Sequence, residues 1–269
     1  MKLARPTILT LRSVALLYLL VLVVVPIVTI LYRSFERGLG TFWEWITTPA
    51  AISALQVSVL IVLITVPLNV IFGIVVSLAL VRGYFPGKGI IQAVVDLPFA
   101  VSPVIIGVSL ILLWGHGGWL GGIENLGFQV IFALPGMVLA TIFVTLPFIV
   151  REVEPVLREI GTEQEQAAAT LGASPWQIFS RITLPAIRWA LTYGIVLTVA
   201  RALGEFGAVI MVASNFAGGG QTLTLLVHSR YIDDHNEFGA YAAATLLMAV
   251  SVAVLILMTT IQKRSRIEH

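Results

Sequence analysis

The sequence contains no cysteine and very little charge. Of its 269 residues 58% are hydrophobic, and only 11% are Asp, Glu, Lys or Arg. The absence of cysteine excludes disulfides, Cys-ligated zinc and thiol chemistry, and it leaves the redox compartment open. A water-soluble domain of this size needs more surface charge, so the composition predicts a polytopic membrane protein. The net charge of +2 then indicates no nucleic-acid partner, because basic residues gather beside membranes.

Motifs for nucleotide binding and hydrolysis are absent as well. Pro86-Gly87-Lys88-Gly89 lacks the spacing and the Ser or Thr of a phosphate-binding loop, so the chain is not expected to hydrolyse ATP. No metalloprotease or serine-hydrolase motif occurs, and neither a catalytic nor a metal site is predicted. An intramembrane enzyme would need a nucleophile–base pair within a span, and none is present. The histidines are expected to be solvated in loops or in the tail: His116, His228, His235 and His269.

The apolar runs predict an all-α integral membrane protein with six transmembrane helices and no soluble domain. The expected organisation is an N-terminal segment 1–13, a transmembrane domain 14–262 that includes a polar loop 151–189, and a tail 263–269. The first apolar run is longer than the core of a signal peptide and is expected to be retained. The six expected spans are 14–32, 54–81, 90–114 (interrupted by Pro98 and Pro103), 128–150, 190–213 and 239–261.

The distribution of basic residues predicts that both termini and the polar loop are cytoplasmic. Among the 16 Lys and Arg residues, Arg201 alone falls within a span. Most of the others lie on the face that holds the N-terminus: Lys2, Arg5, Arg12, Arg82, Lys88, Arg151, Arg158, Arg181, Arg188, Lys263, Arg264 and Arg266. Only Arg33, Arg37 and Arg230 lie on the opposite face.

A long polar, helix-forming stretch at residues 163–185, here called the elbow, interrupts the apolar sequence. Its Ala-rich segment 166–171 predicts a short helix. Gly172 permits a bend, and Ser174-Pro175 suits the cap and first position of a second helix, which Leu184-Pro185 is expected to end. Two short helices at an angle would project from the membrane domain and enter a groove in another protein.

Ionisable residues within spans are costly and are candidates for function. Arg201 and Glu205, four residues apart, would share one helix face and neutralise each other. Two interpretations stay open: a self-satisfied ion pair inside the bundle, or a pair lining the translocation path or its gate, with Arg201 available to an anion. Gly204 and Gly207 are expected to let a neighbouring helix approach closely.

Two more polar residues fall within expected spans. Asp96 precedes Leu97-Pro98, where it is either interfacial or holds a broken helix by accepting main-chain N–H groups. Asn69, beside Pro67, is expected to form an interhelical hydrogen bond rather than to bind a ligand.

The elbow resembles the EAA loop of ABC importer permeases. That pattern, Glu-Ala-Ala, three residues, Gly and an aliphatic-x-Leu-Pro ending, falls on Gln166-Ala167-Ala168, Gly172 and Ile182–Pro185. The family glutamate is Gln166 here, although Glu163 and Glu165 are close by. The resemblance implies a type I importer permease of MetI-like architecture. It also implies that the following residues contact the ATPase: Glu165, Gln166, Ala167, Ala168, Gly172, Ala173, Ser174, Pro175 and Trp176.

Residues 96–103 (DLPFAVSP), 201–208 (RALGEFGA) and 221–225 (QTLTL) are similar to the sulfate/molybdate group of these permeases. The likeness covers most of residues 50–260 and is closest to the W-type sulfate permease subunit. It implies a multi-pass plasma-membrane protein without a bound cofactor. The implied partners are a homologous T-type permease, two copies of an ATPase that binds ATP and Mg, and an extracytoplasmic sulfate- or thiosulfate-binding protein. The translocation path or gate would include Asp96, Ser102, Arg201 and Glu205.

The expected mechanism is that closure of the ATPases displaces the elbow and thereby rotates the fourth and fifth spans. The binding protein would dock on residues 33–53 and 214–238. One alternative is a molybdate or tungstate permease of the same group. Another is a proton- or sodium-coupled carrier with Asp96, Arg201 and Glu205 as its relay. The elbow and the lack of an inverted repeat count against this carrier.

Overall fold

The computed structural model describes residues 5–214, 216 and 220–267, and the secondary structure of this part is entirely helical. Lys2 and His269, which entered the predictions above, lie outside the described residues. Five helices in the described part are long and apolar enough to cross a membrane, and a bent pair raises the number to six if it counts as one span. The all-helical, multi-pass prediction is confirmed.

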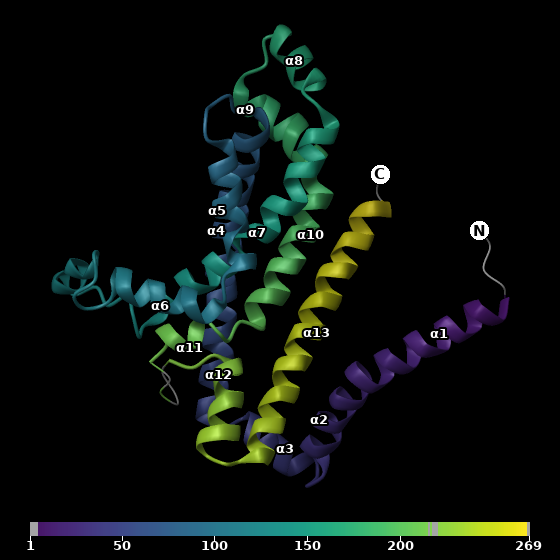
Figure 1. Cartoon of the computed structure of the whole chain (residues 1–269), viewed down its shortest axis with the longest axis vertical. Coiled ribbons are helices and arrows are strands. Elements are labelled where there is room, and N and C mark those ends of the chain that lie inside the picture. Colours follow the sequence, from purple (N-terminus) through teal and green to yellow (C-terminus); the bar gives the residue numbers. More distant parts are fainter. Residues whose placement is uncertain (1–4, 215, 217–219, 268–269) are drawn as a thin grey trace.

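The first span is a continuous helix whose N-terminal part stands apart from the rest of the protein. Helix α1 (Arg5–Leu19), a π-helical turn η1 (Leu20–Val24) and α2 (Val25–Phe35) follow one another without a break. None of the most apolar part of this span is buried, and Figure 1 shows α1 diverging from the bundle. This exposed N-terminal part must face lipid or another subunit, whereas α2 packs against α13 (Glu237–Ile267), where Ser34 Oγ lies 2.7 Å from Thr245 Oγ1.

The centre of the bundle consists of α4 (Pro49–Arg82), α7 (Leu134–Ile160) and α10 (Leu184–Leu203), which all contact one another. Helix α4 meets α7 through a buried stripe of small and polar residues spaced four apart, which lets two helix axes approach closely. Gly73 within this stripe packs directly on the Ile149 side chain of α7. The other members of the stripe are Thr65, Asn69 and Ser77.

The third expected span is broken by more than a right angle. Helices α5 (Lys88–Ala100) and α6 (Pro103–Trp114) are bent by 116° at their junction. Pro98 lies inside α5 without interrupting it, so the break comes from Ser102-Pro103 alone, where the proline opens α6. At 1.5 Å per residue neither helix reaches the roughly 30 Å of a bilayer core. In Figure 1 α6 leaves the bundle sideways, continuing into η2 (Gly121–Leu126).

The fourth and fifth spans have different ends from those expected. Helix α7 starts at Leu134 and continues to Ile160 through residues assigned to the polar loop. The elbow contains α8 (Glu163–Thr170) and α9 (Pro175–Ile178), followed by a second π-helical turn, η3 (Phe179–Thr183). Leu184-Pro185 does not end the second elbow helix: α9, η3 and α10 form one span, Pro175–Leu203.

The π-helical turns η1 and η3 explain how the first span and the span Pro175–Leu203 accommodate proline. Pro185 follows η3 and Pro26 follows η1, each two residues after the turn. In each case the preceding residue bonds five positions back, Leu184 N to Phe179 O and Val25 N to Leu20 O. The wider turn shifts the carbonyl that the proline ring would otherwise strike. Proline therefore begins a new stretch of the helix in both places and does not terminate it.

The end of the molecule opposite the elbow holds α3 (Leu39–Ile46), α12 (Leu223–His228), η4 (Ser229–Asp233) and the start of α13 (Glu237–Ile267) (Figure 1). Residues 223–233 of the expected loop 214–238 are thus helical. Arg230, buried here, donates to Gly239 O at 2.9 Å, to Thr48 Oγ1 at 2.8 Å and to Trp45 O at 3.3 Å. Burial lowers the pKa of Arg230, which Asp234 partly offsets. One guanidinium therefore fastens three segments of this end together.

Candidate functional site

The elbow has the bend that its sequence predicts. Helix α8 ends at Thr170, and Gly172 takes a φ of +86°, a left-handed conformation that glycine adopts without strain. Ser174 and Gln177 then form a capping box: Ser174 N donates to Gln177 Oε1 at 2.8 Å, and Gln177 N to Ser174 Oγ. These contacts satisfy main-chain donors at the start of α9. The sequence here encodes a defined turn between two helices, at the end of the molecule shown at the top of Figure 1.

The tip of the elbow presents large apolar side chains to its surroundings. Leu171 is 89% exposed and Trp176 is 71% exposed. Trp176 is supported by Phe179, whose ring centroid lies 5.6 Å away. Exposed apolar side chains held in a fixed geometry indicate a protein-binding surface. Most of the elbow residues expected to contact an ATPase are exposed as well: Gln166, Ala167, Gly172, Ser174, Pro175 and Trp176.

Glu165 differs from its neighbours on the elbow because its carboxylate faces the protein. It accepts from Arg82 Nε at 3.0 Å and from Thr183 Oγ1 at 2.8 Å. Gln166, by contrast, is exposed and donates only to Thr162, at 3.0 Å. Glu165 therefore contacts two other helical segments of this chain, whereas Gln166 contacts only nearby Thr162 and is exposed.

The ion pair expected between Arg201 and Glu205 is present, but it lies at a helix end. Arg201 Nη1 is 2.6 Å from Glu205 Oε2, and the exposed fractions of the two side chains are 32% and 1%. Helix α10 ends at Leu203, so Glu205 lies in the turn that precedes α11 (Val209–Val212). Its other carboxylate oxygen accepts from Ala208 N at 2.7 Å. Glu205 therefore neutralises Arg201 and also holds the broken segment 204–208 in shape.

This break packs against the other broken helix. A methyl group at Gly207 would lie 3.0 Å from Pro103 Cβ, and one at Gly107 would lie 2.6 Å from Met211 Cβ. Ser102-Pro103 and segment 204–208 are thus neighbours, a site that we call the junction. Gly207 permits the close approach expected of it. Gly204 does not, because only main-chain oxygens of its own helix lie within 4 Å.

Asp96 is not part of the junction contacts. Its Oδ1 accepts from Arg151 Nε at 3.0 Å and from Nη2 at 2.9 Å, and the Arg151 guanidinium lies over the Phe99 ring at 4.3 Å. Within the described part of the chain Asp96 therefore does not bind freed main-chain N–H groups, and its place at the membrane interface stays a prediction. It joins α5 to α7 through a forked, stacked ion pair.

The remaining polar predictions divide between confirmation and correction. Asn69 Nδ2 donates to Thr145 Oγ1 at 2.6 Å, which is the expected interhelical hydrogen bond. His228 is not a solvated loop residue. It ends α12, its ring lies 5.2 Å from that of Phe206, and its buried Nδ1 has no hydrogen-bond partner within the described part of the chain. His116 and His235 are exposed, as expected.

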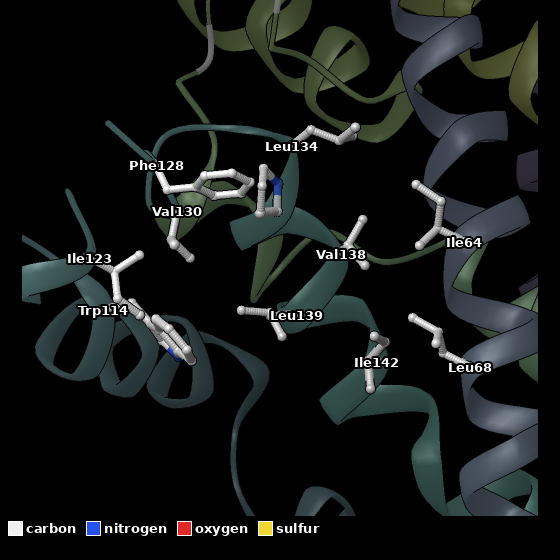
Figure 2. Close-up of a pocket in the computed structure, with 11 residues that line it drawn as sticks. Ile64, Leu68, Trp114, Ile123, Phe128, Val130, Leu134, Val138, Leu139 and Ile142 are labelled. Atoms are coloured by element: carbon white, nitrogen blue, oxygen red, sulfur yellow. The ribbon is translucent and has the colours of Figure 1, made fainter. Parts of the chain in front are cut away.

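An apolar pocket of about 510 Å³ lies between α4, α6 and α7. Figure 2 shows Ile64 and Leu68 of α4 facing Val138 and Ile142 of α7, with Trp114 on the far side. Its lining side chains offer no cation and almost no hydrogen-bond donor. An oxyanion would lose its hydration there without compensation, so this pocket is not an oxyanion site.

Sequence reasoning missed the partners that complete these sites. The sequence marks Arg82 and Arg151 only as indicators of membrane orientation, yet each forms an ion pair with an acidic residue more than fifty positions away. For Thr183, the sequence gives only its position before Leu184-Pro185 and does not indicate its contact with Glu165. Thr224, whose hydroxyl donates to Glu205 O at 2.8 Å, lies within the QTLTL stretch that was singled out only for its resemblance.

Comparisons with known proteins agree with this architecture. The sequence profile of the family described as "Binding-protein-dependent transport system inner membrane component" matches residues 69–267. The chain is 45% identical over 254 residues to the "Sulfate transport system permease protein CysW" of Synechocystis sp., covering 94% of this chain and 92% of that protein. It is 43% identical over 245 residues to the protein of the same name in Escherichia coli K12. That match covers 90% of this chain and 84% of that protein.

Two further relatives extend the comparison. The "Sulfate transport system permease protein CysT" of Synechocystis sp. is 37% identical over 254 residues, covering 94% of this chain and 88% of that protein. Among solved structures, a bacterial ABC transporter involved in alginate import matches with a TM-score of 0.79 and 16% identity. The match covers 96% of this chain and 95% of that chain. The structural match shows a shared fold, and the sequence matches confirm the resemblance seen in the elbow. The chain therefore belongs to the binding-protein-dependent transport system inner-membrane component family, the permeases of ABC importers.

Proposed function

We propose that this chain is the non-catalytic permease half of an ATP-driven sulfate importer. The relatives described above are named as sulfate transport permeases of two types, W and T. The identity is higher to the W-type, which supports pairing with a T-type subunit. Two copies of a separate ATPase would supply the energy, and an extracytoplasmic binding protein would deliver the anion. The membrane would be the plasma membrane, with both termini cytoplasmic.

The observation that carries this proposal is the shape of the elbow. It combines a rigid bend at Gly172 with the exposed side chains of Leu171 and Trp176. The surface fits a hydrophobic groove of an ATPase subunit. Since α9 continues through η3 into α10, a displacement of the elbow tip acts directly on a membrane-spanning helix. ATP-driven closure of the partner would thus tilt α10 and change access to the junction.

The sulfate path would pass the junction, between this chain and its partner permease. The Arg201 side chain is 32% exposed at the junction. Helix α6 begins there at Ser102-Pro103, with the positive end of its helix dipole. A divalent oxyanion is attracted to both. Glu205 already forms an ion pair with Arg201, which keeps the attraction to the anion weak. Weak binding suits a transport path, because the path must release the anion that it admits. Interrupted helices near the bilayer centre commonly provide such polar positions in transporters.

Asp96 would act at a second position on the same path. Its partner Arg151 is exposed, and the Asp96 carboxylate accepts from only two of the three guanidinium nitrogens, Nε and Nη2. The pair connects α5 with α7 between the junction and the elbow end of the molecule, where a transported anion would leave. Binding protein would dock at the other end, on α3 and the α12–η4 segment, whose shape Arg230 maintains.

The direct test is uptake of radiolabelled sulfate into proteoliposomes that contain the permease pair and the ATPase, with binding protein outside. The proposal predicts uptake that requires ATP and binding protein and that persists with a protonophore. Excess molybdate should compete weakly. Uptake that collapses with the protonophore and continues without ATP would establish the ion-coupled carrier instead. Preferential uptake of molybdate would show that molybdate, and not sulfate, is the substrate.

A further inference from the structure

Arg82, the last residue of α4, contacts the ends of two other segments. Its Nε donates to Glu165 Oε2 at 3.0 Å and its Nη2 to Glu165 Oε1 at 3.3 Å. The same guanidinium donates to Leu157 O at 3.1 Å and to Gly161 O. These carbonyls lie at the end of α7, where a cation is favourable because the last four carbonyls lack helical partners. Arg82 thus connects α4 with both α7 and α8.

Glu165 extends these contacts to a fourth segment. Its Oε1 also accepts from Thr183 Oγ1 at 2.8 Å, and Thr183 is buried in η3 at the base of α10. The side chains of Arg82 and Glu165 are each only 19% exposed, so water competes little with the pair. A forked guanidinium–carboxylate contact fixes orientation as well as distance. The carboxylate therefore holds α8 in one position relative to α4 and α10.

The two ends of the elbow differ in their covalent connection. On one side α9 runs into α10 as unbroken helix. On the other side only Gly161-Thr162 separates α7 from α8, and Gly161 has a φ of +64°. A glycine link of this kind transmits little force by itself. The contacts of Arg82 and Glu165 are what make this side stiff.

We propose that the Arg82–Glu165 pair is a latch that makes α4 and α7 move with the elbow when the ATPase closes. The two residues are positioning residues: they touch neither sulfate nor ATP. This inference rests on the proposed coupling role of the elbow. It assigns Glu165 to transmission within the chain, whereas docking falls to the exposed residues beside it. With the latch intact, displacement of the elbow reaches three spanning helices, and without it the displacement reaches α10 alone.

The test is Glu165→Gln in the complete reconstituted complex, with three measurements on each sample. These are the ATPase bound per permease, the rate of ATP hydrolysis and the sulfate imported per ATP hydrolysed. The latch predicts unchanged binding, retained hydrolysis and a drop of roughly tenfold in sulfate per ATP, within the range of known coupling effects. Glu154→Gln is the matched control, because the Glu154–Arg158 ion pair lies within α7 and connects no other element.

Graded variants keep the test decisive if Glu165→Gln folds poorly. Thr183→Val removes one hydrogen bond to Glu165 and leaves the ion pair, and Arg82→Lys keeps the charge without the fork. Both should lower sulfate per ATP by less than Glu165→Gln does. The double variant Arg82→Gln with Glu165→Gln should be no worse than the more severe single variant, because the two residues act as a unit.

The outcomes separate this inference from the proposed function. If Glu165→Gln lowers ATPase binding, Glu165 is a docking contact, and the latch is wrong while the elbow's role stands. If binding and sulfate per ATP both match the Glu154→Gln control, the latch is likewise wrong. If the unmodified complex neither binds ATPase nor imports sulfate with ATP, the proposed function itself fails.

Discussion

Gly207 and Pro103, more than a hundred positions apart, are in contact: a methyl group on Gly207 would lie 3.0 Å from Pro103 Cβ. This contact brings the break between α5 and α6 against the break between α10 and α11. Main chain that leaves its helix inside a membrane is tolerated only where protein or a polar cavity surrounds it. The two breaks provide that surrounding for each other, and Arg201 and Glu205 lie beside them.

Close packing at the junction predicts that glycines there differ in their tolerance of a methyl group. In Gly107→Ala the new methyl would lie 2.6 Å from Met211 Cβ and 2.8 Å from Ala208 O. Overpacking of this kind costs about 1–3 kcal/mol. Gly204→Ala is the control, because its nearest atom is 3.7 Å away. Thermal unfolding in detergent should show a lowered midpoint for Gly107→Ala alone, and equal midpoints would contradict the packing.

The ion pair at the junction predicts an order of stabilities. Arg201→Leu leaves the carboxylate of Glu205 buried without a counter-ion, which costs about 3–5 kcal/mol. The double variant Arg201→Leu with Glu205→Leu removes both charges and should be more stable than Arg201→Leu alone. Its remaining defect is the Ala208 N–H, which loses its acceptor. Denaturant unfolding of the three proteins checks the order, and a double variant less stable than Arg201→Leu would show that the pair is not coupled.

The capping box predicts a local effect of one hydroxyl in the elbow. Ser174→Ala removes the acceptor for Gln177 N and should cost about 1 kcal/mol of helix stability. Hydrogen exchange of the main chain at residues 174–178 should speed up by about fivefold. Ser180→Ala is the control, because the Ser180 hydroxyl bonds only to Trp176 O of its own helix. Equal exchange in the two variants would argue against the cap.

The hydrogen bond between Asn69 and Thr145 predicts a modest coupling energy between α4 and α7. Both side chains are buried, and Asn69 Nδ2 lies 2.6 Å from Thr145 Oγ1. Hydrogen bonds between helices in membranes average about 0.6 kcal/mol in double-mutant cycles. A cycle with Asn69→Ala and Thr145→Ala, followed by unfolding in detergent, should give a value near this. A coupling energy of zero would mean that the contact contributes packing alone.

Much of the fold could be read from the sequence because apolar runs and breakers are local signals. The membrane class, the bend at Gly172, the Ser174 cap and the pairing of Arg201 with Glu205 all depend on residues a few positions apart. Proline was the least reliable of these signals. Pro98 and Pro185 both lie in helices that continue past them. At Pro185 the preceding π-helical turn η3 adapts the helix to the proline ring.

The rest of the site could not be read because it depends on contacts between distant segments. Arg82 with Glu165, Arg151 with Asp96, and Gly207 with Pro103 each join different helices. Their pairing follows from how α4, α5, α7 and α10 pack, and one sequence carries no record of that packing. The same reason explains why Glu165 was grouped with exposed elbow residues, although its carboxylate faces inward.

The central claim is that an ATPase seats on the tip of the elbow, and the absence of native cysteine makes this directly measurable. Thr170→Cys places a single thiol beside the exposed Leu171 and leaves Leu171 and Trp176 intact. A photoactivatable thiol reagent at this position should cross-link to the ATPase in membranes. The same reagent at Trp119→Cys should not, although Trp119, between α6 and η2, is 92% exposed. Cross-linking at both positions or at neither would contradict the account.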